Sequence, residues 1–82
     1  KRVSKNRFEV SARVTIEEFE EKVGKFIKRS EREEADTLGG LVFYLVGRIP
    51  ERGEVISHSS GTEFSIIDAD TRRIKKMLIT LK

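Results

Sequence analysis

Residues 37–54 read TLGGLVFYLVGRIPERGE, and this stretch does most to decide the fold. Thr37 is a good helix N-cap, because its hydroxyl can accept a hydrogen bond from an unpaired amide of the first turn. An almost uninterrupted apolar run follows and stops at Gly47, a residue type common at helix C-termini. Pro50 comes three residues later and prevents the helix from continuing. The segment therefore predicts a helix from Thr37 to Gly47, followed by a turn through Gly53.

A strand and another helix are predicted upstream. Polar and apolar residues alternate over residues 7–11, which is the period of a strand with one buried face. Thr15 stands three residues before Glu18, so the two side chains can form the capping box that often opens a helix. The apolar positions that then recur at helical spacing are Ile16, Phe19 and Val23. We expect a strand over residues 7–11 and a helix that ends near Gly24.

Residues 25–36 are highly charged and are predicted to form a solvated loop. Residues 29–34 in particular contain no apolar side chain. The acidic members of the segment are Glu31, Glu33, Glu34 and Asp36. We expect Arg29 and Arg32 to compensate these charges locally, so the sequence indicates no site in this segment.

The last third of the chain changes to the period of β-strands. Residues 54–58 and 62–68 are interpreted as two strands joined by the short glycine-containing connection of residues 59–61. Residues 72–81 are interpreted as a third strand. The order strand, helix, helix and three strands predicts an α+β domain, in which an antiparallel sheet carries two helices on one face.

The final strand contains a break in its alternation. Its apolar residues are Ile74, Met77, Ile79 and Leu81. Ile74 is out of phase with the other three, and a one-residue bulge near Lys75 and Lys76 would let all four face the core. We predict such a bulge.

Composition limits the class of protein. The 82 residues suit a single domain, residues 1–82, with one core. The net charge of +3 arises from interleaved signs, 17 Lys and Arg against 14 Asp and Glu, which does not indicate a polyanion partner. The chain has no cysteine, so disulfides and thiolate chemistry are excluded. Its longest mainly apolar run, residues 38–46, is far shorter than the ~20 residues that cross a bilayer. We expect a soluble fragment of a longer protein, without direct membrane insertion.

Four segments together resemble the signature of the CorC/HlyC transporter-associated domain. They are residues 37–42 (TLGGLV), 47–54 (GRIPERGE), 64–67 (FSII) and 70–76 (DTRRIKK). The likeness extends from about Phe8 to Ile79, and the ordered combination is specific. Two positions depart from the pattern, since Ala35 stands where an aromatic residue is common and Thr71 where glycine is common.

The resemblance implies a fold, a context and a role. Domains of this family lie at the C-terminus of hemolysin-like, CBS-domain-containing magnesium and cobalt efflux proteins. The implied role is that of a non-catalytic accessory or regulatory domain at the cytoplasmic face of the bacterial inner membrane. The implied partners are the CBS and membrane domains of the parent protein. The fold is similar to a subdomain of FAD-binding oxidoreductases, so no cofactor is expected, with FAD or another adenine nucleotide as the alternative that this likeness allows.

The predicted helix of residues 37–47 holds two candidate sites. Thr37, Gly39 and Gly40 lie in its first turn, where free amides and the helix dipole can hold an anion such as phosphate. We favour a different interpretation, in which the glycines let the helix approach the sheet closely. Phe43 and Tyr44 lie off its main apolar stripe and are candidates for contact with a neighbouring domain or with a second copy of the chain. The alternative is that the charged segment or the terminal strand covers them.

A basic cluster gives an alternative function. Its members are Arg72, Arg73, Lys75 and Lys76. With Phe64 in the same sheet, they could form a surface for phosphates and stacked bases, as in a small nucleic-acid-binding module. We favour a basic, solvated edge strand instead, and expect no nucleic-acid partner.

Candidates for catalysis and metal binding are few. His58 lies between Ser57 and Ser59, and neighbours on a strand point to opposite faces, so neither serine can pair with it as an activated nucleophile. We expect a surface histidine and no catalytic residues. Asp68 and Asp70 share a face but supply only two of the about six oxygen ligands that a hard cation needs, so a turn aspartate is favoured over a metal site.

Overall fold

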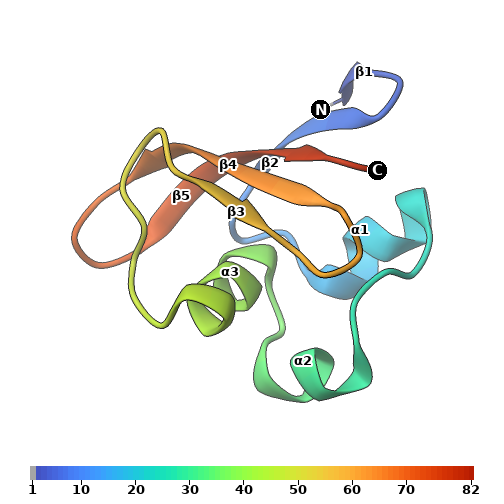
Figure 1. The fold of residues 1–82 in the computed structure, drawn as a ribbon, viewed down its shortest axis with the longest axis horizontal. Coiled ribbons are helices and arrows are strands. Elements are labelled where there is room, and N and C mark those ends of the chain that lie inside the picture. Colours follow the sequence, from blue (N-terminus) through green and yellow to red (C-terminus); the bar gives the residue numbers. More distant parts are fainter. Residues whose placement is uncertain (1) are drawn as a thin grey trace.

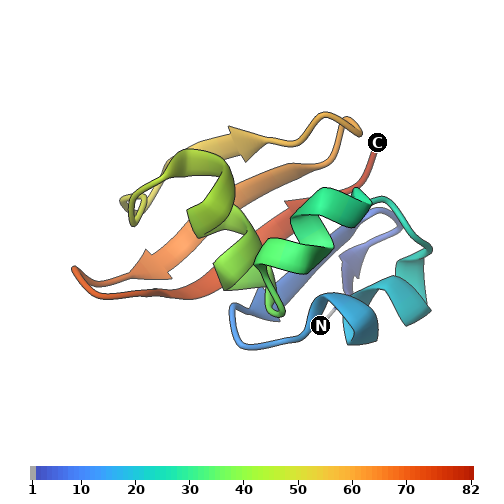
Figure 2. The same cartoon turned by 90° about the horizontal axis from the view of Figure 1, so that it is seen from below.

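The computed structural model describes residues 2–82. Five strands form one antiparallel sheet in the order β1-β2-β5-β4-β3, and three helices lie on one of its faces (Figure 1). Figure 2 shows the three helices side by side from below. The elements are β1 (Arg2–Ser4), β2 (Arg7–Ser11), α1 (Ile16–Val23), α2 (Arg29–Glu34), α3 (Leu38–Val46), β3 (Val55–Ser57), β4 (Glu63–Ala69) and β5 (Ile74–Thr80). The predicted α+β class is confirmed, as is the packing of the helices on one side.

The core lies between the inner face of the sheet and helices α1 and α3. Its strand residues, each at most 6% exposed, are Phe64, Ile66, Ile74, Met77 and Ile79. Its helix residues, each at most 3% exposed, are Ile16, Phe19, Leu38, Leu41 and Val42. Removal of these apolar side chains from water is the main force that holds the helices against the sheet.

The helix ends follow their local sequence signals. The Thr15 hydroxyl accepts a hydrogen bond from the Glu18 amide at 3.1 Å, and the Glu18 carboxylate accepts one from the Thr15 amide at 3.4 Å. This is the predicted capping box of α1. At the start of α3, the Thr37 hydroxyl accepts a hydrogen bond from the Gly40 amide at 3.0 Å. Gly47 ends α3 in the left-handed conformation at φ +80°. The predicted boundaries of both helices are therefore confirmed.

The predicted bulge in the final strand is also present. Asp68 pairs with Lys76 and Ala69 pairs with Ile74, so Lys75 has no partner on β4. This single extra residue shifts the alternation, and Ile74 is buried on the same face as the residues that follow it. Those following residues are Met77 and Ile79, which are buried, and Leu81, which is partly buried.

The terminal strand lies at the centre of the sheet, and the prediction that it is an edge strand was wrong. β5 pairs with β2 on one side and with β4 on the other. The edges are β1 and β3, each of three residues. The composition of residues 74–80 does not specify which strands pair with them, so the sequence of this segment could not reveal that β5 is central.

Two elements were missed. β1 forms a short hairpin with β2, and α2 occupies residues 29–34 of the predicted solvated loop. α2 contains no apolar side chain, and the residue that it buries is Glu31. The fold therefore has three helices instead of the expected two, and the third is held through polar contacts.

Candidate functional site

The first turn of α3 has its amides paired within the chain. The Leu38 amide donates to the Val14 carbonyl at 2.9 Å, and the Gly39 amide donates to the Ala12 carbonyl at 2.9 Å. The next two amides, of Gly40 and Leu41, both donate to oxygens of Thr37. The amides of residues 38–41 are thus already in use, and anion binding at Thr37, Gly39 and Gly40 stays an untested prediction.

Close packing accounts for the first of the two glycines. A Cβ atom on Gly39 would lie 2.8 Å from the Ala12 Cβ and 3.1 Å from the Ala12 carbonyl oxygen. A Cβ on Gly40 would meet only the Thr37 hydroxyl at 3.2 Å and the Ala35 Cβ at 3.5 Å. Gly39 therefore lets α3 lie directly against the segment that joins β2 to α1, which agrees with the close-approach interpretation.

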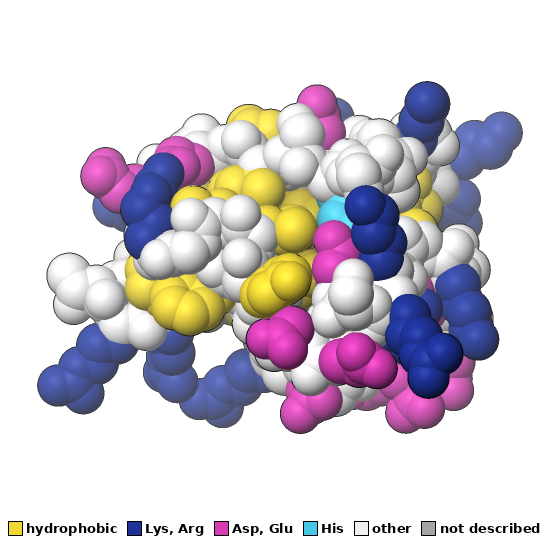
Figure 3. Space-filling model, turned by 60° about the horizontal axis from the view of Figure 1, so that its bottom comes forward, with side chains coloured by type: hydrophobic (Ala, Val, Ile, Leu, Met, Phe, Trp, Pro, Cys, Tyr) yellow, Lys and Arg dark blue, Asp and Glu magenta, His cyan; other side chains and the backbone are white. Residues whose placement is uncertain are grey.

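The second half of α3 presents aromatic side chains to solvent. Phe43 is 47% exposed and Tyr44 is 46% exposed, whereas Leu41 and Val42 are fully buried. Both side chains therefore keep about half of their surface exposed, so neither the charged segment nor the terminal strand buries them fully. Figure 3 shows hydrophobic side chains gathered over α3 on the helix-covered face. We call Phe43 and Tyr44 the α3 aromatic pair, and it remains the candidate contact surface.

His58 is buried, contrary to the expected surface histidine. Its side chain is 1% exposed, and its Nε2 lies 2.8 Å from a carboxylate oxygen of Glu31 on α2. Its Nδ1 accepts a hydrogen bond from the Ser60 amide at 3.0 Å. The ring also packs edge-on against Phe26 and Phe64. The signal that sequence reasoning missed was the period of two, since His58 follows the inward-facing Ile56 by two residues.

Glu31 joins α2 to the core through this contact. Burial alone would raise the pKa of Glu31, but the hydrogen bonds from His58 and from the Lys28 amide outweigh it and hold this pKa below 4.5. The carboxylate is therefore kept ionised inside the fold. No pattern within residues 29–34 marks Glu31 as the buried member.

A second buried carboxylate fixes the chain between α1 and α2. The Glu20 carboxylate accepts from the amides of Phe26 at 2.8 Å and Ile27 at 3.1 Å, and it forms a two-pronged ion pair with Arg32. Burial opposes ionisation, yet these bonds lower the pKa of Glu20 from 4.5. Its position gave a usable signal, because Glu20 follows the core residue Ile16 by four residues and so lies on the buried stripe of α1.

These two clusters are structural in character. Both ring nitrogens of His58 are engaged by Glu31 and Ser60, and Ser57 and Ser59 are exposed. Within residues 2–82, every deeply buried side-chain nitrogen or oxygen has a partner. A general base needs a free lone pair within reach of a substrate proton, and this imidazole offers none. The same side chains instead clamp α2 and the β3–β4 connection to the core.

The basic cluster does not form a stacking surface. Phe64 is fully buried, so its ring cannot contact a nucleobase. Lys75 and Lys76 form ion pairs with Asp70 at 3.7 Å and with Glu9 at 3.6 Å. This arrangement disfavours the nucleic-acid alternative, because stacked bases need exposed aromatic rings.

Asp70 is a turn residue. Its carboxylate accepts from the amides of Arg72 at 2.8 Å and Arg73 at 2.9 Å, and these bonds lower its pKa from 3.8. The favoured interpretation of Asp70 is confirmed. In the part of the chain that the structure describes, no three His, Asp or Glu side chains are grouped so that they could hold a metal ion, and no helix is long and apolar enough to span a bilayer.

The comparison with known families decides the assignment. The sequence model of the CorC/HlyC family, described as "Transporter associated domain", matches residues 1–82. The chain belongs to this family. A domain of the same family from Neisseria meningitidis, described as a "putative Mg2+ and Co2+ transporter(CorC)associated region", has 33% identity and a TM-score of 0.85, covering 99% of this chain and 95% of that one.

Longer relatives share the same region. The "Magnesium and cobalt efflux protein CorC" of Vibrio cholerae is 38% identical over 81 residues, which are 99% of this chain and 26% of the relative. The "Possible hemolysin C" of Rickettsia bellii is 40% identical over 72 residues, 88% of this chain and 24% of that protein. This CorC/HlyC domain thus spans about a quarter of the length of the curated relatives it matches.

Proposed function

We propose that this CorC/HlyC domain is a non-catalytic accessory domain of a longer protein that exports magnesium or cobalt. The observation that carries the proposal is the match of the whole chain to about a quarter of a relative named for magnesium and cobalt efflux. The remaining three quarters of such a protein provide ample room for the machinery that moves the ion.

The side chains favour an assembly role over a chemical one. The buried polar groups are paired with one another, and the clusters that they form hold α2 and the β3–β4 connection in place. Exposed aromatic side chains such as the α3 aromatic pair lose unfavourable contact with water when a partner covers them. We propose that this pair contacts a neighbouring domain of the parent, either a CBS domain or the membrane domain, at the cytoplasmic face of the bacterial inner membrane.

The proposal is tested by grafting. In a strain that depends on the Vibrio cholerae relative for cobalt tolerance, the region matched by this chain is either deleted or replaced by residues 1–82. We expect the deletion to lower cobalt tolerance and the graft to restore most of it. Normal tolerance after the deletion, with the truncated protein still made in normal amount, would show that this domain is dispensable for export.

A further inference from the structure

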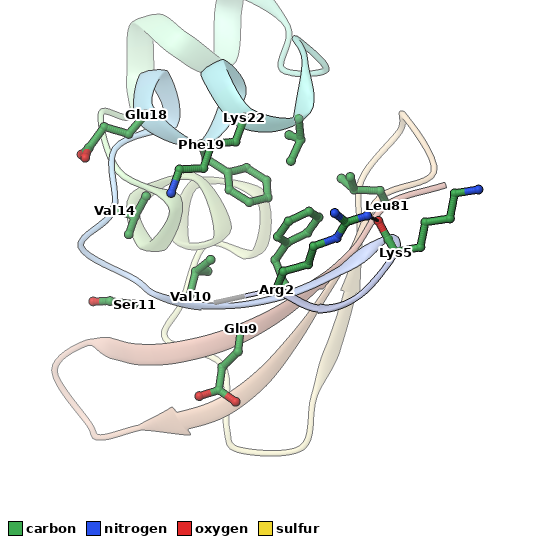
Figure 4. A pocket seen from close by; sticks show the side chains of 12 residues that line it. Arg2, Lys5, Glu9, Val10, Ser11, Val14, Glu18, Phe19, Lys22 and Leu81 are labelled. Carbon is green, nitrogen blue, oxygen red and sulfur yellow. Dashed lines mark hydrogen bonds between the residues drawn. The ribbon is translucent and has the colours of Figure 1, made fainter.

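A groove of about 670 Å³ lies between α1 and β2, and none of its lining residues belongs to α3 (Figure 4). Its apolar lining residues are Phe8, Val10, Val14, Phe19, Val23 and Leu81. Of these, Phe19 is buried, and the other five are only partly buried. The volume falls in the range of about 300–1,000 Å³ that is usual for small-molecule sites.

Among residues 2–82, the cations that line this groove have no acidic partner. They are Arg2 and Lys5 from the β1–β2 hairpin and Lys22 from the last turn of α1. Within the described residues 2–82, no carboxylate lies at ion-pair distance from any of the three. Figure 4 shows Lys22 extending from α1 towards the sheet, and Arg2 lying beside Leu81 at the other side of the groove.

Arg2 is held in place at the groove. Its Nε donates to the Ser4 carbonyl at 3.0 Å, and its Nη2 donates to the Lys5 carbonyl at 2.9 Å. Its guanidinium carbon lies 6.0 Å from the centre of the Phe8 ring. These bonds use two of the five N–H donors of the guanidinium and leave the other three for a ligand. The Arg2 guanidinium is therefore an ordered cation beside the apolar floor of the groove.

The two acidic lining residues do not neutralise the groove. Glu9 projects from the opposite face of the sheet, where it pairs with Lys76 at 3.6 Å (Figure 4). Glu18 points away from the groove, and its carboxylate is bonded to Thr15 in the capping box. The space between α1 and β2 therefore combines an apolar floor with a positive rim.

We propose that this groove binds a hydrocarbon-tailed anion, such as a fatty-acid carboxylate or an alkyl phosphate. The tail lies on the floor formed by Phe8, Val10 and Val23, and the head group meets the cations of the rim. Charge complementarity selects an anion over a neutral or cationic amphiphile. Burial of the apolar surface that these partly buried side chains still expose supplies the main driving force. The site stands on these side chains alone and does not depend on the proposed role in ion export.

The probe is dodecyl phosphate, added below its micelle concentration to the 82-residue chain and followed by amide chemical shifts. We expect saturable shifts at Val10, Val14 and Val23. Dodecyl maltoside has the hydrocarbon tail without the charge, and inorganic phosphate has the charge without the tail. Each should bind at least about tenfold more weakly than dodecyl phosphate.

Two matched pairs of variants locate the site. Lys22→Glu should weaken binding about five- to tenfold through loss and reversal of one exposed charge, whereas Arg72→Glu, in the β4–β5 turn, should leave it unchanged. Val23→Asp should abolish binding, whereas Val55→Asp on the distant edge strand β3 should not. Unchanged amide spectra away from each substitution establish that the variants are folded.

The source of the anion is distinguished with vesicles. If the chain co-sediments with phosphatidylglycerol vesicles but not with phosphatidylcholine vesicles, and Lys22→Glu does not co-sediment, the anion is a membrane lipid. If the chain binds dodecyl phosphate tightly but co-sediments with neither kind of vesicle, the anion is a free amphiphile. Both results support the site. Unsaturable shifts, equal affinity for dodecyl maltoside, or tighter binding of an acidic amphipathic peptide than of dodecyl phosphate would overturn the proposal.

Discussion

His58 and Glu31 form a buried hydrogen bond of 2.8 Å between residues 27 positions apart in the sequence. The amide of Ser60 can only donate, so Nδ1 of His58 is an acceptor and the ring proton lies on Nε2, facing the carboxylate. Nε2 of His58 thus donates to the Glu31 carboxylate. This bond anchors α2, a helix that brings no apolar side chain to the core.

Loss of the histidine should therefore destabilise the domain. In His58→Ala the Glu31 carboxylate loses its side-chain donor and keeps only the Lys28 amide, which should lower the free energy of unfolding by about 1–3 kcal/mol. Urea denaturation measures the change. Arg29→Ala is the control, because its ion pair with Glu33 at 3.7 Å is exposed and should contribute less than about 1 kcal/mol. Equal effects of the two substitutions would contradict the anchoring role of His58.

Acid should weaken the turn that follows α3. The two-pronged hydrogen bond from Arg48, at 2.8 Å to each carboxylate oxygen, and the bond from the Glu51 amide lower the pKa of Glu54 to about 2. Because this pKa is lower in the folded state than its ordinary value of 4.5, the contribution of Glu54 to stability is complete above pH 4.5 and is lost as the pH falls towards 2.

Thermal unfolding between pH 7 and pH 2 tests this relationship. Between about pH 4.5 and about pH 2, Glu54→Gln should lose less stability than the unaltered chain. Arg52→Gln, a substitution of an exposed neighbour, should lose as much stability as the unaltered chain. The carboxyls of Glu20 and Glu31 also have lowered pKa values, so some acid sensitivity should remain in Glu54→Gln. The idea fails if the two variants show the same pH dependence as the unaltered chain.

The two glycines of α3 should respond differently to alanine. In Gly39→Ala the new methyl group would lie 2.8 Å from the Ala12 Cβ, so α3 must move away from its neighbour at a cost of about 1–3 kcal/mol. In Gly40→Ala the nearest atom is 3.2 Å away, and the higher helix propensity of alanine offsets part of the crowding. Chemical denaturation should rank Gly39→Ala as the less stable variant. The opposite ranking would remove the packing explanation for Gly39.

Local signals were sufficient for the elements whose ends are fixed by neighbouring residues. Thr15, Thr37 and Gly47 mark helix ends through bonds within four residues, and all three were predicted. The bulge beside Lys75 was predicted because a change of phase within one strand is visible in its own sequence.

Contacts between distant residues were beyond such reasoning. The stability of α2 depends on His58, and the central position of β5 depends on β2 at the other end of the chain. The groove likewise forms only when Lys22 of α1 and Arg2 of β1 are brought to the same space. In each case the partner is specified by tertiary packing, which the spacing of residues within one element does not encode.

The most direct test of the account is the rate of cobalt export by cells that carry this domain grafted into the Vibrio cholerae relative. The unaltered graft is compared with Phe43→Ser/Tyr44→Ser, and Val55→Ser, at another exposed apolar position on β3, serves as the control. We predict that the double variant exports cobalt more slowly at an unchanged protein level, while the control matches the unaltered graft. Equal export rates for all three would contradict the claim that the domain acts through the α3 aromatic pair.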